Sequence, residues 1–154
     1  MSKVGRYKKI VVPIDGSGWS QRAITHAADL AHMSHGEVIL LHVFKPPLHE
    51  YQDTLALAGE GEQISRIRDD TKQKLTALRS QLRSEGIDCR VQVIEAVGIV
   101  SQICDYVNEE GADLIVMSTH GRTGISRFVF GSVAHKVVQG VDIPVLLIHP
   151  DKGE

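Results

Sequence analysis

Short apolar runs alternate with longer segments of helical periodicity along the chain. Five runs are rich in Val, Ile and Leu, and four of the five are almost continuously apolar. They cover residues 10–14, 38–43, 91–94, 114–117 and 145–148. Continuous apolar character is typical of parallel strands that helices cover on both faces. The pattern therefore predicts five strands in a mostly parallel sheet.

The segments between these strands repeat apolar residues at intervals of three and four, as helices with one buried face do. Four such segments cover residues 23–31, 64–82, 100–107 and 133–138. This alternation predicts an α/β, doubly wound, Rossmann-like fold with helices on both faces of the sheet. Residues 45–61 contain two prolines and two glycines without periodicity, which predicts a flexible loop. No linker divides the chain, so we expect residues 1–154 to form one domain.

Composition and charge restrict the class of protein. With 154 residues, 42% hydrophobic and 23% charged, the chain has the size and balance of one globular domain. The formal net charge of −2, without a long run of Lys or Arg, disfavours nucleic-acid binding. No apolar stretch approaches the ~18 residues that span a bilayer, and residues 1–9 are not followed by the apolar core of a signal peptide. These features favour a cytoplasmic protein that does not bind membranes.

The segment that follows the fourth predicted strand is rich in glycine and opens the last helix. It contains Gly121, Gly124 and the pair Gly131-Ser132. In open α/β sheets the carboxyl ends of the strands meet the amino ends of helices, where backbone N–H groups attract anions. Glycine also lets a phosphate approach the backbone closely, which favours a nucleotide site. The alternative is that the glycines serve a long turn and that Ser132 only caps the helix.

A second candidate is Asp15, which follows the first predicted strand. Its carboxylate could reach a ribose hydroxyl, a base or a bound metal. The alternative is turn chemistry, because Asp, Gly and Ser are common in tight strand-to-helix turns. Two known phosphate-binding motifs do not match. The chain has no G-x-x-x-x-G-K-[ST] sequence, and Gln21 stands where a dinucleotide fingerprint starting at Gly16 requires its third glycine.

One ligand can use both of these segments only if the first and fourth strands are neighbours. This arrangement requires the strand order 3-2-1-4-5, with the ligand at the switch point. The fifth strand then lies at the edge of the sheet, where Pro144–His149 is too apolar to face water. The sequence therefore predicts a homodimer in which this strand meets its own copy across a two-fold axis.

In this arrangement the chain resembles the universal stress protein family, in its nucleotide-binding branch. The resemblance rests on four segments that stand in the family's order: Ile-Val-Val-Pro-Ile-Asp-Gly-Ser, Val-Ile-Leu-Leu-His-Val, Ala-Asp-Leu-Ile-Val-Met and Gly-Arg-Thr-Gly…Gly-Ser-Val-Ala. The family's ATP-binding pattern is G-x2-G-x9-G-[ST]. Gly121 and Gly131-Ser132 match this pattern, whereas Ser118 replaces its first glycine. A serine hydroxyl there can bond to ribose or phosphate.

The resemblance implies an ATP-binding, homodimeric regulatory protein of the stress response. AMP and ADP are alternative ligands, phosphate oxygens would carry any Mg, and a protein partner of unknown identity would respond to the nucleotide. The adenosine side would be lined by Pro13, Asp15, Val43, Met117 and Ser118. Ribose and phosphates would be held by Gly121, Arg122, Thr123, Gly124, Gly131, Ser132 and Val133.

Two other functions stay open at this stage. Some family members hydrolyse ATP slowly with Mg, but no residue of this chain has a spacing that marks it as the catalytic base. Asp15, His120 and His135 qualify by residue type only. The other alternative is a dimeric interaction module without nucleotide binding, which the serine at position 118 favours.

Overall fold

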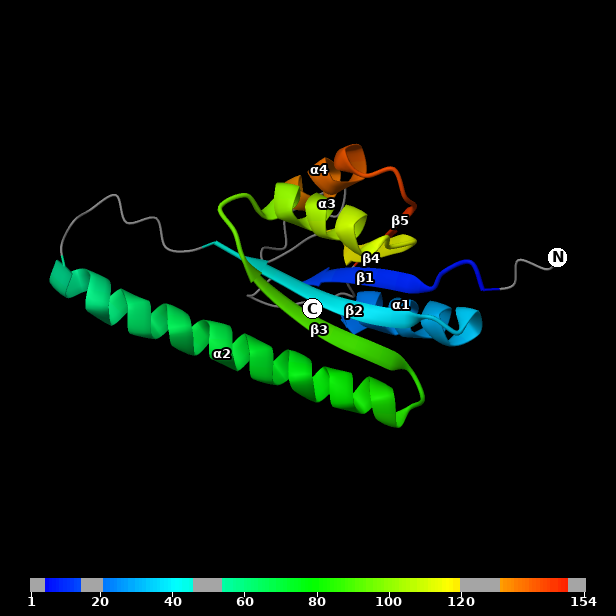
Figure 1. Cartoon of the computed structure of the whole chain (residues 1–154), viewed down its shortest axis with the longest axis horizontal. Helices are drawn as coiled ribbons and strands as arrows, with labels where there is room; N and C mark the ends of the chain where they lie inside the picture. The colour runs from blue at the N-terminus through cyan, green and yellow to red at the C-terminus, as the bar shows by residue number, and fades with distance from the viewer. Residues whose placement is uncertain (1–4, 15–20, 46–53, 120–130, 150–154) are drawn as a thin grey trace.

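The computed structural model describes residues 5–14, 21–45, 54–119 and 131–149. The strands within these ranges are β1 (Lys9–Ile14), β2 (Glu37–Phe44), β3 (Asp88–Glu95), β4 (Leu114–Ser118) and β5 (Val145–Ile148). The helices are α1 (Gln21–Ser34), α2 (Thr54–Ser84), α3 (Ile99–Glu110) and α4 (Ser132–Gly140). Strands and helices alternate as the hydrophobic pattern predicts (Figure 1). None of the described helices is both long and apolar enough to cross a bilayer.

The strands form one sheet in the order β3-β2-β1-β4-β5, which confirms the predicted order. Every registered pair of strands is parallel, so the described sheet is wholly rather than mostly parallel. β1 lies at the centre, and β3 and β5 lie at the two edges. Because the strands are parallel, all their carboxyl ends lie at the same end of the sheet.

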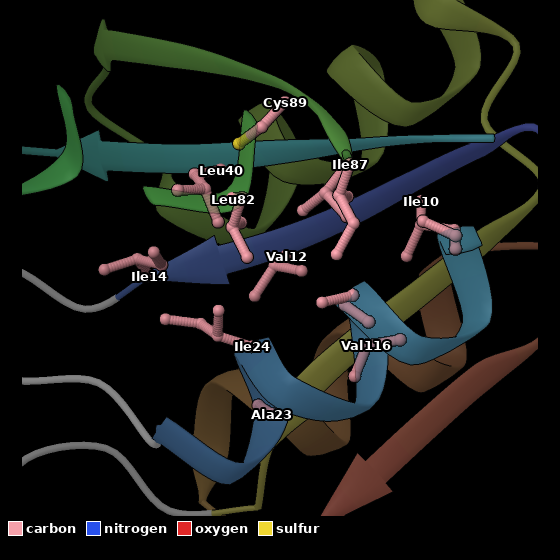
Figure 2. Packing of buried hydrophobic residues seen from close by; sticks show 14 of the residues in the cluster. Ile10, Val12, Ile14, Ala23, Ile24, Leu40, Leu82, Ile87, Cys89 and Val116 are labelled. Atoms are coloured by element: carbon pink, nitrogen blue, oxygen red, sulfur yellow. The ribbon is translucent and has the colours of Figure 1, made fainter. Parts of the chain in front are cut away.

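Helices cover both faces of the sheet (Figure 1). α1 and α2 pack on the face that receives Ile10, Val12 and Leu40, the cluster drawn in Figure 2. α3 and α4 pack on the opposite face, which receives Val11 and Ile39. Successive residues of β1 and β2 therefore enter different cores, which explains why both strands are apolar without interruption. Each such side chain contributes about 1.5–3 kcal/mol on burial, so helices are held firmly on both faces.

The predicted flexible loop over residues 45–61 is wrong in its second half, because α2 begins at Thr54. Residues 46–53 lie outside the described ranges. Gly59 and Gly61 misled the prediction, since a glycine inside a helix costs only about 1 kcal/mol relative to alanine. The neighbouring Ala, Leu and Glu residues are strong helix formers, and a helix that has nucleated adds one hydrogen bond per residue. The helix therefore extends through both glycines, and Figure 1 shows its amino-terminal part running past the sheet.

Candidate functional site

The pairing between β1 and β4 is confined to the first half of β1. It ends at Val11 and Ile115, whereas β1 pairs with β2 along its whole length. The carbonyl of Lys9 accepts a hydrogen bond of 2.9 Å from the N–H of Asp113. From Lys9 onward, the backbone N–H and C=O groups of every second residue of β1 therefore point toward β4. Pro13 is one of these residues and has no N–H to donate. Proline therefore accounts for the end of this ladder near the carboxyl end of β1.

The same place is the topological switch point of the sheet. The helix that follows β1 covers one face, and the helix that follows β4 covers the other. Open α/β sheets bind their ligands outside the carboxyl ends of the strands at such a point. The structure thus confirms the neighbouring strands on which the predicted site depends.

The predicted site residues that the structure describes lie near the carboxyl ends of strands or at the start of α4. They are Pro13, Val43, Met117, Ser118, Gly131, Ser132 and Val133. Val43 and Met117 are buried in the same cluster, on the face that α3 and α4 cover. Pro13 and Ser118 are half-buried. The remaining predicted residues, Asp15, Gly121, Arg122, Thr123 and Gly124, lie outside the described ranges.

The start of α4 is held against the end of β4 by a main-chain hydrogen bond. The N–H of Gly131 donates to the carbonyl of Thr119 at 2.7 Å, and the helix's first turn closes when the N–H of His135 donates to the carbonyl of Gly131 at 3.0 Å. Gly131 is the N-cap, so the proposed capping role of Ser132 is wrong: Ser132 is the first helical residue. The N–H groups of residues 132–134 come before the first turn closes and belong to the positive end of the helix dipole.

Thr119 and His149 join β4 to β5 just beyond the strand ends. Thr119 is 1% exposed, and its N–H donates to the carbonyl of Ile148 at 2.9 Å. Its hydroxyl Oγ1 lies 3.3 Å from Nδ1 of His149. Sequence reasoning missed both residues. The available signal was a polar residue directly after a buried strand and directly before a glycine segment.

His42 is a third residue that the sequence did not single out. It lies in β2, is 4% exposed, and its Nδ1 is 3.0 Å from the carbonyl oxygen of Ile14. A carbonyl can only accept, so Nδ1 carries the proton in this contact. The ring also stacks on Phe44, with centroids 5.8 Å apart. His42 therefore fastens the last residue of β1, immediately before Asp15 in the chain.

Positive charge reaches this end of the sheet from α1. Arg22 Nη1 donates to the carbonyl of His149 at 2.7 Å, so a guanidinium lies beside the end of β5. Of the candidate catalytic bases, His135 is described and lies exposed on α4, whereas Asp15 and His120 lie outside the described residues. Slow hydrolysis of ATP therefore stays a prediction.

Comparisons with known proteins agree with this architecture. The model of the universal stress protein family matches residues 6–149. Universal stress protein MJ0531 of Methanocaldococcus jannaschii is 32% identical over 151 residues, covering 96% of this chain and 85% of that protein. The solved structure of the hypothetical protein MJ0577, from the same organism, has a TM-score of 0.76 and 27% identity and covers 96% of this chain and 99% of its own. A universal stress protein from Archaeoglobus fulgidus, solved in complex with dAMP, has the same fold, with a TM-score of 0.63, 24% identity and coverage of 92% and 98%.

Proposed function

The chain belongs to the universal stress protein family, and we propose on this premise that it binds an adenine nucleotide, with ATP as the main ligand. The ligand would lie beyond the carboxyl ends of β1, β2 and β4, with its phosphates at the start of α4. The observation that carries the proposal is the position of Gly131. Its hydrogen bond to Thr119 sets the amino end of α4 beside the switch point, where the N–H groups of the first turn can meet an anion.

The backbone conformation of Gly131 does not explain why position 131 is a glycine. With φ −58° and ψ 149°, it occupies a region that any L-residue adopts. The conformation alone therefore does not require glycine. Close approach of a phosphate does, because a Cβ would keep the ligand away from the backbone. Gly131 and Ser132 are also the last two residues of the family's G-x2-G-x9-G-[ST] pattern.

The adenosine side of the proposed site has an apolar floor. Val43 and Met117 are 6% and 5% exposed and belong to one cluster. Pro13 ends the β1–β4 ladder next to them in the sheet, as described above. An adenine ring would pack against these apolar groups, as flat ligands do in largely apolar pockets. The dAMP complex of the Archaeoglobus fulgidus protein places an adenine nucleotide on the same fold.

We further propose a homodimer that acts as a nucleotide-dependent regulator in the stress response. β5 is an edge strand, and Val145, Leu146 and Leu147 are each only partly buried. An apolar edge of this kind is suited to pairing with its own copy. Mg would be carried by the phosphate oxygens of the nucleotide, and the bound nucleotide would alter the surface offered to a partner protein.

The test of nucleotide binding is calorimetric titration of AMP, ADP and ATP with Mg into the nucleotide-free protein and into Gly131→Val. Valine fits the backbone conformation of residue 131 but obstructs the phosphates, so we expect ATP affinity to fall by about a hundredfold or more, comparable to losing charge-assisted hydrogen bonds from several N–H groups.

The matched control is Gly98→Val, which changes the N-cap glycine of α3. Gly98 has φ −106° and ψ 109°, and a Cβ there meets the hydroxyl of Ser101, a short side chain that can turn aside. This variant should bind ATP as the wild type does. A folded wild type that binds no nucleotide at millimolar concentration would contradict the proposed function and leave the interaction module as the remaining hypothesis.

A further inference from the structure

Thr119 connects three segments that are separate in the sequence. Its carbonyl accepts the N–H of Gly131, its N–H donates to Ile148, and its hydroxyl contacts His149. The first contact belongs to the start of α4, and the other two belong to the end of β5. The residue that sets the amino end of α4 is therefore itself held from the neighbouring strand.

The side chain of Thr119 also takes part in these contacts between α4 and β5. At 1% exposure it has almost no contact with solvent, so its hydroxyl must be satisfied within the protein. Nδ1 of His149 supplies one such partner at 3.3 Å. The carbonyl of His149 in turn accepts a hydrogen bond from Arg22 at 2.7 Å, which ties the histidine backbone to α1. The contacts of Thr119 thus lead from α4 through β5 to α1.

We propose that Thr119 is a positioning residue of the nucleotide site, which sets where the first turn of α4 presents its N–H groups to the phosphates. This inference rests on the proposed function. The Thr119 carbonyl fixes Gly131, and the hydroxyl, held by His149, fixes the orientation of the Thr119 peptide. If this orientation relaxes, the N–H groups of α4 shift relative to β4, whereas the adenosine side, formed by residues of β1, β2 and β4, keeps its place in the sheet.

The positioning role predicts a loss of affinity that depends on the phosphates. Thr119→Val keeps the shape of the side chain and removes its hydroxyl. We expect the affinity for ATP to fall by about tenfold, because the lost hydrogen bond to His149 orients the N–H groups that meet the phosphates. The affinity for adenosine should fall by less than about twofold. Thr119→Ser, which keeps the hydroxyl, should bind ATP nearly as the wild type does. Equal losses for ATP and adenosine would show a merely structural role and overturn the inference.

The matched control is Thr71→Val, which removes a hydroxyl from another buried threonine, 5% exposed, on α2. α2 packs on β3 at the opposite edge of the sheet, so this variant should bind both ligands as the wild type does. A second measurement needs no ligand. In the nucleotide-free protein, Thr119→Val should speed hydrogen exchange at the Gly131 amide, and unchanged exchange would overturn the inference.

The outcomes separate this inference from the function on which it rests. If the wild type binds ATP and Thr119→Val binds it equally well, only the positioning role is overturned. If the wild type binds neither ATP nor adenosine, the proposed function fails, and the role of Thr119 in it fails as well. If ATP alone weakens, exchange at Gly131 rises and Thr119→Ser restores binding, the positioning role is supported.

Discussion

At its amino end the sheet is closed by charged side chains, whereas at its carboxyl end the described contacts are mostly main-chain hydrogen bonds. Arg90 of β3 binds Glu37 of β2 through Nε and Nη2, at 3.1 and 2.9 Å, and its Nη2 also binds Glu110 of α3 at 3.0 Å. At the other end, Thr119 holds Gly131 and Ile148 through its backbone. The charged groups of a side-chain ion pair satisfy one another, whereas the start of a helix leaves backbone N–H groups that a ligand can use.

The amino end also holds the first residues of the sheet in place. Oδ2 of Asp113 accepts the N–H groups of Lys8 and Lys9, both at 2.9 Å, and Nζ of Lys9 donates to the carbonyl of Glu110 at 3.0 Å. The charges are therefore used to join β1, β2, β3 and α3. The comparison indicates that charged side chains join the strands at one end of the sheet, while the proposed nucleotide site lies at the other.

Of the variants that compare the two ends of the sheet, Leu147→Pro should have the largest effect, and it tests assembly near the carboxyl end. The N–H groups of Ile115 and Thr119 donate to the carbonyls of Pro144 and Ile148. The backbone groups of every second residue of β5 therefore point toward β4, and those of Leu147 point toward the free edge of the sheet. A proline at position 147 has no N–H, so a two-fold interface loses one hydrogen-bond donor from each copy. At about 1 kcal/mol for each hydrogen bond, the dimer dissociation constant should rise about thirtyfold, as measured by sedimentation equilibrium.

Leu147→Ala is the matched variant, because it shortens the same side chain but keeps the N–H. If the edge pairs through its main chain, the alanine variant should remain more strongly dimeric than the proline variant. A wild type that is monomeric at all concentrations tested would contradict the proposed dimer itself.

The next effect concerns stability at the amino end. Arg90→Met leaves Glu37 and Glu110 without their shared cation, and the Arg90 side chain is 42% exposed, which moderates the loss. We expect the free energy of unfolding to fall by about 1–2 kcal/mol in urea denaturation. ATP affinity should not change, because the network lies at the far end of the strands.

Arg68→Met provides the control for removing a surface arginine. Nε of Arg68 lies 3.7 Å from Oδ1 of its neighbour Asp69, and both side chains are exposed. Such pairs contribute less than about 1 kcal/mol, so stability should hardly change. If Arg90→Met were as mild as Arg68→Met, the amino-end network would not be a determinant of stability.

The smallest effect is a difference in acid sensitivity. The hydrogen bond from Arg90 lowers the pKa of Glu110 below its ordinary value of 4.5, so the folded state keeps this carboxylate ionised at a pH where the unfolded state binds a proton. The resulting stability is present above pH 4.5 and is lost as the pH falls through the lowered pKa. The melting temperatures of wild type and Arg90→Met should therefore converge as the pH falls from 4.5 through the lowered pKa of Glu110, whereas a constant difference would assign the loss to packing instead.

Much of the fold could be predicted from local pattern. The five apolar runs correspond to the five strands, and β5 matches its predicted bounds of Val145–Ile148. The strand order followed from one further assumption, that a single ligand uses the segments after the first and fourth strands. The start of α2 could not be predicted in this way, because Gly59 and Gly61 are read as breaks locally but are accommodated by a helix that continues from its neighbours.

The residues of the candidate site could be predicted where they belong to a motif, but not where their role depends on contacts with residues distant in the sequence. Gly131 and Ser132 stand in a recognisable spacing, although only the structure shows that Gly131 rather than Ser132 is the N-cap. His42 and Thr119 carry no such spacing. Their roles depend on Ile14 and His149, which lie 28 and 30 residues away in the chain.

The sequence by itself determined the alternation of strands and helices, the burial of the strands on both faces and the family, because these properties follow from residue order over short distances. Only the tertiary structure decided which polar groups meet: Arg90 with Glu37, 53 residues apart, at one end of the sheet, and Thr119 with His149 at the other. The physical reason is that strand register and helix docking bring such groups within hydrogen-bond distance, and both depend on the packing of the whole core rather than on any local pattern.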